Sequence, residues 1–163
     1  YPAEGISRAA LHAKYGGEEA YVQRMLDAFG RNGLPYAPPP DVVPNTRKAL
    51  QVTELARDLG LHPQFHDRLM EAYWEQETNV GDPDVLRLLA AEIGLDAEQV
   101  EDVLASDRYV DRIKASTEQA HSIGITGIPG FLLDGKLVLT GAYPLDVFDQ
   151  AMAQIGRAQV EGA

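Results

Sequence analysis

Apolar residues recur every three to four positions over most of the chain, which predicts a series of amphipathic helices. In the stretch 18–29, for example, Tyr21, Met25 and Phe29 follow one another at four-residue spacing and share one face. The same pattern predicts further helices over about residues 7–16, 46–59, 83–94, 97–104 and 107–122, and others that begin near Pro63 and Pro144. The first two thirds of the chain are therefore expected to be helical.

Several of these helices carry recognisable start and stop residues. Asn45 is a good N-cap for the helix over 46–59, and Gly60 fits the position just after its end. Asp82 followed by Pro83 is typical of a helix start, and Asp96 begins a sequence that resembles a capping box. These signals support separate short helices rather than one long one.

The periodicity changes after Gly124. Residues 130–133 and 136–139 are short apolar runs on either side of Asp134-Gly135, a pair that favours the positive φ angles of a tight hairpin turn. By contrast, residues 34–43 contain four prolines and are expected to form an extended loop. The chain thus ends, before a last helix, in one predicted β-hairpin.

This hairpin is apolar on both faces, which is typical of strands inside a sheet covered on both sides. A lone two-stranded hairpin is only marginally stable in water, and its open edges invite pairing. We find no other strand in the sequence. The missing strands must come from a segment upstream of Tyr1 or from a partner chain, and the upstream segment is the simpler explanation.

Composition excludes several classes of function. The chain has 163 residues and a formal net charge of −11, with no cluster of Lys and Arg, so nucleic acid and anionic membranes are disfavoured as partners. No apolar run approaches the roughly 20 residues of a membrane-spanning helix. The absence of cysteine excludes disulfides and thiolate metal sites within these residues. We expect a cytoplasmic protein.

The histidines give no convincing metal site. His62 and His66 are four residues apart and could share a helix face, but Pro63 places His62 at the helix start and no third ligand is evident. His12 and His121 are isolated in the sequence. We therefore predict no bound metal.

The sequence Gly-Ile-Thr-Gly-Ile-Pro-Gly-Phe over residues 124–131 leads into the hairpin, which Thr140-Gly141-Ala142 and a closing helix follow. This arrangement resembles the C-terminal half of thioredoxin-like folds, and most closely the DsbA-like branch that includes FrnE and the 2-hydroxychromene-2-carboxylate isomerases. Segments 2–5, 43–46 and 79–83 also resemble parts of the helical insertion of FrnE-like proteins. The resemblance covers nearly the whole chain.

The resemblance implies an α+β fold derived from an α/β parent. Residues 1–122 would be a helical insertion of five or six helices, and residues 123–163 the ββα end of a thioredoxin-like domain. The family places a C-x-x-C motif, or a Ser in the isomerases, in an N-terminal βαβ part, which is absent from these 163 residues. We therefore expect a segment of about 30 or more residues before Tyr1, and no catalytic residue within the chain itself.

Three functions stay open. The first is a bacterial thiol–disulfide oxidoreductase that acts on a disulfide-containing protein or a small thiol, without a cofactor. The second is an isomerase or transferase that uses glutathione. The third is a non-catalytic helical module that lends its hairpin to a partner's sheet, and a homodimer is compatible with each. In the first two cases the whole protein is an enzyme and the present chain alone is inactive.

The family resemblance also implies a substrate-binding loop. Pro129 corresponds to the family's cis-proline, so Gly127, Ile128 and Pro129 are predicted to face the substrate. Trp74, on the insertion, is a further candidate because that insertion faces the active site in the family, although a packing role is the simpler expectation for its aromatic ring.

Overall fold

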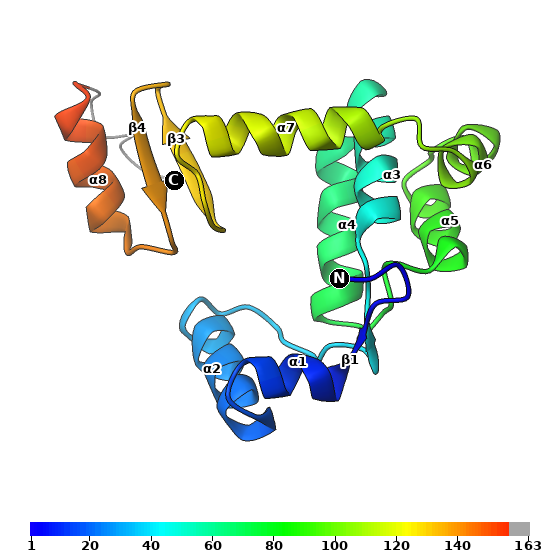
Figure 1. The fold of residues 1–163 in the computed structure, drawn as a ribbon, viewed down its shortest axis with the longest axis horizontal. Helices are drawn as coiled ribbons and strands as arrows, with labels where there is room; N and C mark the ends of the chain where they lie inside the picture. The colour runs from blue at the N-terminus through cyan, green and yellow to red at the C-terminus, as the bar shows by residue number, and fades with distance from the viewer. Residues whose placement is uncertain (157–163) are drawn as a thin grey trace. The chain divides into compact units, whose positions relative to one another are not determined.

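The computed structural model of the chain describes residues 1–156 and consists of two compact units, Tyr1–Asp111 and Arg112–Ala163, each of which is described by itself (Figure 1). The division falls within helix α7, before the boundary at residues 122 and 123 that the sequence suggested. The first unit contains, in its described residues, β1 (Ile6–Ser7), α1 (Arg8–Lys14), α2 (Glu18–Arg31), β2 (Val42–Val43), α3 (Arg47–Asp58), α4 (His62–Trp74), α5 (Pro83–Glu92) and α6 (Ala97–Ala105). Helix α7 (Val110–Ser122) leads into the second unit, which continues with β3 (Gly130–Leu133), β4 (Leu137–Thr140) and α8 (Leu145–Gln154).

Helix α3 is the centre of the first unit and contacts α4, α5 and α6. Its buried residues Leu55 and Ala56 follow the buried Val52 by three and four positions. The three residues therefore share one face of the helix, and this face is shielded from water. Phe65 of α4 and Leu86 of α5 are fully buried against this core. The unit therefore has a self-contained apolar core formed by four helices.

Side-chain caps fix the ends of several helices as the sequence predicted. Asp82 Oδ1 accepts a hydrogen bond from Asp84 N at 2.8 Å, and Asp96 Oδ1 accepts one from Gln99 N at 3.0 Å. The prediction for α3 was off by one residue, because the helix begins at Arg47. Its N-cap residue makes no side-chain cap, and Asn45 Oδ1 instead accepts a hydrogen bond from Arg47 N at 2.9 Å.

The expectation that the hairpin is the only strand pair was wrong. Ile6 pairs with Val43 and Ser7 with Val42 in a second antiparallel ladder. Each strand is only two residues long and the partners lie far apart in the sequence, so neither alternation nor a turn signals them. Gly5 precedes β1 with φ 81°, and a Cβ there would collide with the Val43 carbonyl, so only glycine fits.

The predicted β-hairpin is confirmed in the second unit. Strands β3 and β4 pair in register from Gly130–Thr140 to Leu133–Leu137, and Asp134 and Gly135 take positive φ angles of 52° and 66° in the turn. No residue of either strand is buried. The apolar strands that the sequence assigned to a covered sheet are thus left uncovered by the described residues.

These elements confirm the predicted α+β fold class. None of the described helices combines the length and the apolar character needed to cross a membrane.

Candidate functional site

The predicted substrate-binding residues Gly127, Ile128 and Pro129 lie in the loop of residues 123–129, which joins α7 to β3. Gly124 takes φ 89° and its N–H donates to the His121 carbonyl at 3.0 Å, while Ile125 N donates to the Ala120 carbonyl at 3.0 Å. This left-handed glycine with two backward hydrogen bonds is a common helix end. It ends α7 and sets the direction in which the loop leaves the helix.

Close packing fixes the far side of the loop. A Cβ added to Gly130 would lie 2.5 Å from Ile125 Cγ2, so a larger residue would displace the loop. Gly141 N, just after β4, donates to the Pro129 carbonyl at 2.8 Å. The loop is therefore tied to both strands of the hairpin.

Ile128 is the most exposed large apolar residue among those described, with 96% of its surface accessible. The Ile128–Pro129 peptide bond is cis. Neither the N–H nor the carbonyl of Ile128 has a hydrogen-bond partner among residues 1–156. The loop thus presents an unpaired backbone amide beside a strand edge.

A cavity of about 380 Å³ lies behind this loop, within the second unit. Helix α7 contributes Ser116, Thr117, Ala120 and His121 to its wall, and the loop contributes residues 125–128. The Thr117 hydroxyl donates to the Ile113 carbonyl at 3.0 Å, so one of the two hydroxyls is already engaged. The volume and the mixed lining suit a small polar ligand or one extended side chain.

The loop and cavity can bind but hold no thiol nucleophile, because the chain contains no cysteine. Within the described part of the chain, no three His, Asp or Glu side chains are grouped so that they could hold a metal ion. His62 and His66 stack at 5.9 Å between ring centroids, but His62 Nε2 is occupied by Arg57 Nη2 at 2.9 Å.

Trp74, the other predicted site residue, ends α4 in the first unit. Its ring packs against Phe29 at 5.1 Å and Tyr73 at 4.9 Å between centroids, and its carbonyl accepts a hydrogen bond from Ala37 N. These contacts tie α4 to α2 and to the Pro-rich segment. Trp74 has a structural role in this cluster, and its role in substrate binding stays a prediction.

Two further polar groups of the first unit, the buried His12 and the half-buried Tyr73, were not predicted from sequence. His12 is 6% exposed and packs on Tyr21 at 5.1 Å between ring centroids. Burial is the main cause that raises the pKa of Tyr73 to about 12. Both groups lie in the first unit. In the sequence pattern Tyr73 was part of an apolar helix face, and His12 had no assigned role.

The family model of the DSBA-like thioredoxin domain matches residues 3–153. The uncharacterized protein YwbO of Bacillus subtilis (strain 168) is 30% identical over 111 residues, which make up 68% of this chain and 55% of that protein. The chain therefore spans about half the length of this curated relative.

Two solved structures are also similar. The SCO1869 protein of Streptomyces coelicolor, provisionally described as a DsbA oxidoreductase, has a TM-score of 0.79 and 32% identity; the match covers 96% of this chain and 70% of that one. A Nitrosomonas europaea protein, provisionally described as a protein disulfide isomerase, has a TM-score of 0.62 and 21% identity, with 85% and 76% coverage. The second likeness shows the fold alone.

Proposed function

Because the chain belongs to the DSBA-like thioredoxin domain family, we propose that it forms the substrate-side part of a thiol–disulfide oxidoreductase. The 32% identity to the Streptomyces coelicolor protein over nearly the whole chain supports this reaction class. Within the family we assign the chain to the FrnE-like branch, on the basis of the helical insertion and the segments that resemble it. The substrate would be a disulfide-containing protein or a small thiol, in the cytoplasm.

The geometry at Ile128 carries the proposal. Its backbone N–H and carbonyl have no partner among residues 1–156, and its side chain is 96% exposed. An extended peptide can pair with such a backbone as an added strand would. Pairing at Ile128 would hold a substrate disulfide beside the ring of Pro129, which has no N–H to compete.

The nucleophile would come from a segment outside residues 1–163. The uncovered faces of β3 and β4 support this, because apolar strands of this kind need further strands and helices around them. A cysteine at a helix N-terminus there would have a lowered pKa and would attack the substrate disulfide as a thiolate.

The reaction would follow ordinary thiol–disulfide exchange. The thiolate forms a bond to one substrate sulfur while the substrate S–S bond breaks and its second sulfur leaves as a thiolate. The second cysteine of a C-x-x-C pair then attacks the mixed disulfide, which leaves the enzyme oxidised and the substrate reduced. The reverse sequence oxidises a dithiol substrate, and neither direction needs a further cofactor.

A second candidate is an isomerase or transferase that uses glutathione. The cavity of about 380 Å³ favours it, because Ser116 and His121 place polar groups beside the exposed loop where a small thiol peptide could lie. In that case a Ser or Cys outside these residues would position the thiolate of glutathione.

One comparison tests the proposal. We expect the natural full-length protein to reduce a disulfide-linked peptide in the presence of a thiol reductant, whereas residues 1–163 alone do not, since they carry no thiol. A full-length protein that has no redox-active thiol would contradict the proposal. Binding of glutathione without disulfide exchange would select the isomerase class instead.

A further inference from the structure

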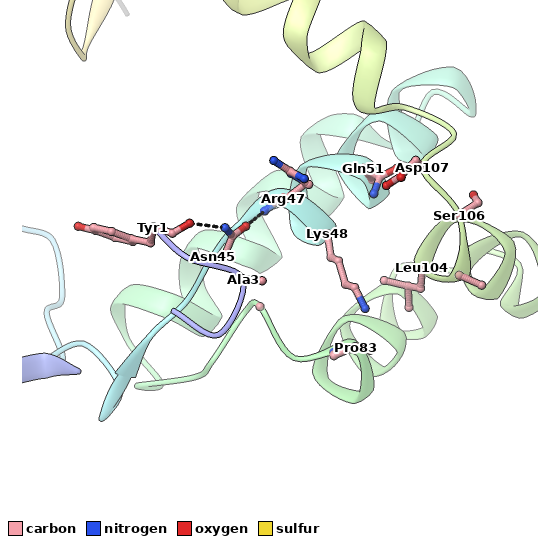
Figure 2. A pocket seen from close by; sticks show the side chains of 12 residues that line it. Tyr1, Ala3, Asn45, Arg47, Lys48, Gln51, Pro83, Leu104, Ser106 and Asp107 are labelled. Carbon is pink, nitrogen blue, oxygen red and sulfur yellow. Dashed lines mark hydrogen bonds between the residues drawn. The ribbon is translucent and has the colours of Figure 1, made fainter. Parts of the chain in front are cut away.

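A second cavity, of about 660 Å³, lies entirely within the first unit (Figure 2). Its wall is formed by the first residues of the chain, the start of α3, the turn before α5 and the end of α6. The lining includes Arg47, Lys48, Gln51, Pro83, Leu104 and Asp107. This cavity is separate from the loop and cavity of the second unit.

Two neighbouring cations at the start of α3 line the cavity. Neither the guanidinium of Arg47 nor the ammonium of Lys48 makes a hydrogen bond or a contact ion pair with the described residues. At longer range Lys48 adds to the effect of Arg87, which lowers the pKa of the Glu101 carboxyl. The other arginines between residues 1 and 156 all have partners, as Arg87 does in its 2.7 Å contact with Glu101. In a chain with a net charge of −11, two adjacent cations without a carboxylate in direct contact are unexpected.

Gln51, one helical turn further along α3, adds a buried donor. The residue is 3% exposed, and its Oε1 accepts a hydrogen bond from Tyr109 N at 3.2 Å. Because a backbone N–H must meet the amide oxygen, this contact fixes which end of the amide is nitrogen. The Nε2 group has no partner among residues 1–156, and the side chain lines the cavity. The Nε2 group can therefore donate to a ligand acceptor in the cavity.

The backbone of α3 adds to the positive electrostatic potential of Arg47 and Lys48. The neutral Asn45 Oδ1 accepts the Arg47 N–H, and no acidic side chain lies in the first turn of the helix, so its N-terminal end stays positive. In Figure 2 the Lys48 side chain extends from this end toward Leu104 and Pro83, which form the apolar part of the wall. Positive charge and an apolar surface thus occur in one cavity.

The surroundings hold these groups in place. Ala49 and Val52, on the buried side of α3, are 1% and 0% exposed, so the helix that carries the three donors is anchored in the core. A Cβ at Gly81 would lie 2.7 Å from Pro44 Cβ and 2.9 Å from the Asn45 carbonyl oxygen. The turn before α5 therefore packs directly against the segment that leads into α3.

We propose that this cavity binds a small organic molecule that carries a single carboxylate. The planar Arg47 guanidinium matches the geometry of a carboxylate, and Lys48 and the Gln51 amide offer further donors. Asp107 is the one acid among the lining residues, so together with the two cations it leaves one net positive charge. That charge complements a monoanion and disfavours a dianion. Leu104 and Pro83 receive the apolar body of the ligand.

Titration of the ¹⁵N-labelled full chain with benzoate tests this, with benzyl alcohol as the uncharged analogue and inorganic phosphate as the dianion. We expect benzoate to shift the Gln51 side-chain amide resonances and the backbone amides of Lys48 and Ala49 in a saturable way. Benzyl alcohol and phosphate should bind more weakly. Lys48→Gln and Arg47→Gln should each weaken benzoate binding about tenfold.

Arg31→Gln is the matched control, because Arg31 contacts only the carbonyl of Asp27 on its own helix and lies away from the cavity lining. It should leave benzoate binding unchanged. Equal weakening by Arg31→Gln would show general attraction of anions and would overturn the proposal. Equal binding of benzyl alcohol, or no shift at Gln51 under saturating benzoate, would overturn it as well.

Discussion

The two units of the chain bury their apolar residues to very different extents. In the first unit Phe65, Leu86, Val52 and Val103 are completely buried between four helices. In the second unit no residue of β3 or β4 is buried, and Leu132 of β3 is 47% exposed although both strands consist mostly of apolar residues. The first unit has a core of its own. The hairpin strands of the second unit are as apolar as core strands, but the described residues do not cover them.

The two units therefore differ in how far their stability depends on residues outside the unit. The helical unit obtains its stability from contacts among its own residues, so it is expected to fold without help. A two-stranded hairpin is marginal by itself, and the edges of β3 and β4 offer unpaired backbone groups. The exposed loop at Ile128 belongs to the dependent unit, which agrees with a site completed by residues outside this chain.

The largest expected effect comes from a matched pair of truncations. Phe65→Ala should lower the free energy of unfolding of the first unit by about 3–5 kcal/mol, because it leaves a cavity in a fully buried position. Leu132→Ala in β3 should cost less than about 1 kcal/mol, because the side chain is half exposed. Urea unfolding followed by circular dichroism measures the first loss, and amide hydrogen exchange resolves the second. Equal losses would remove the contrast between the units.

A smaller difference is expected at the helix starts. Asp96→Ala removes the cap of α6 and should destabilise the first unit by about 1 kcal/mol. Asp146→Ala, in the first turn of α8, should change stability by no more than about 0.5 kcal/mol, because α8 has no side-chain cap to lose. Amide hydrogen exchange in α6 for Asp96→Ala, and in α8 for Asp146→Ala, checks the order of the two losses of stability.

The smallest effect concerns alkaline pH. The pKa of Tyr73 is raised from 10.0 to about 12, mainly by burial, so the folded state keeps a neutral phenol where the unfolded state loses a proton. This stability is present below pH 10 and is lost as the pH rises toward 12. Tyr73→Phe should reduce the loss of stability between these pH values. An unchanged pH profile for Tyr73→Phe would show that other groups control alkaline unfolding.

The parts of the fold that depend on local chemistry could be predicted from the sequence. Asp82-Pro83 and Asp96 marked helix starts, and Asp134-Gly135 marked the hairpin turn, because each of these signals acts over a few residues. The ladder between β1 and β2 could not be predicted, because it depends on two segments more than 30 residues apart. The same holds for the aromatic cluster that joins Trp74 to Phe29.

The candidate loop could be located from sequence because Gly127, Ile128 and Pro129 form a continuous motif. Its backbone exposure could not, since that depends on which residues cover it. The cavity beside α3 was missed altogether. Its donors Arg47, Lys48 and Gln51 resemble an ordinary polar helix face, and only the contact with the distant Tyr109 N–H shows that the Gln51 amide is buried and held with its oxygen toward that N–H.

In the proposed function a substrate pairs with the backbone of Ile128 while its disulfide meets a thiol from outside these residues. The most direct test is amide hydrogen exchange on the natural full-length protein, free and trapped as a mixed disulfide with a peptide. We predict that the Ile128 amide becomes protected in the trapped complex and that the turn amide of Gly135 does not. No protection at Ile128 in a complex that forms the mixed disulfide would contradict the account.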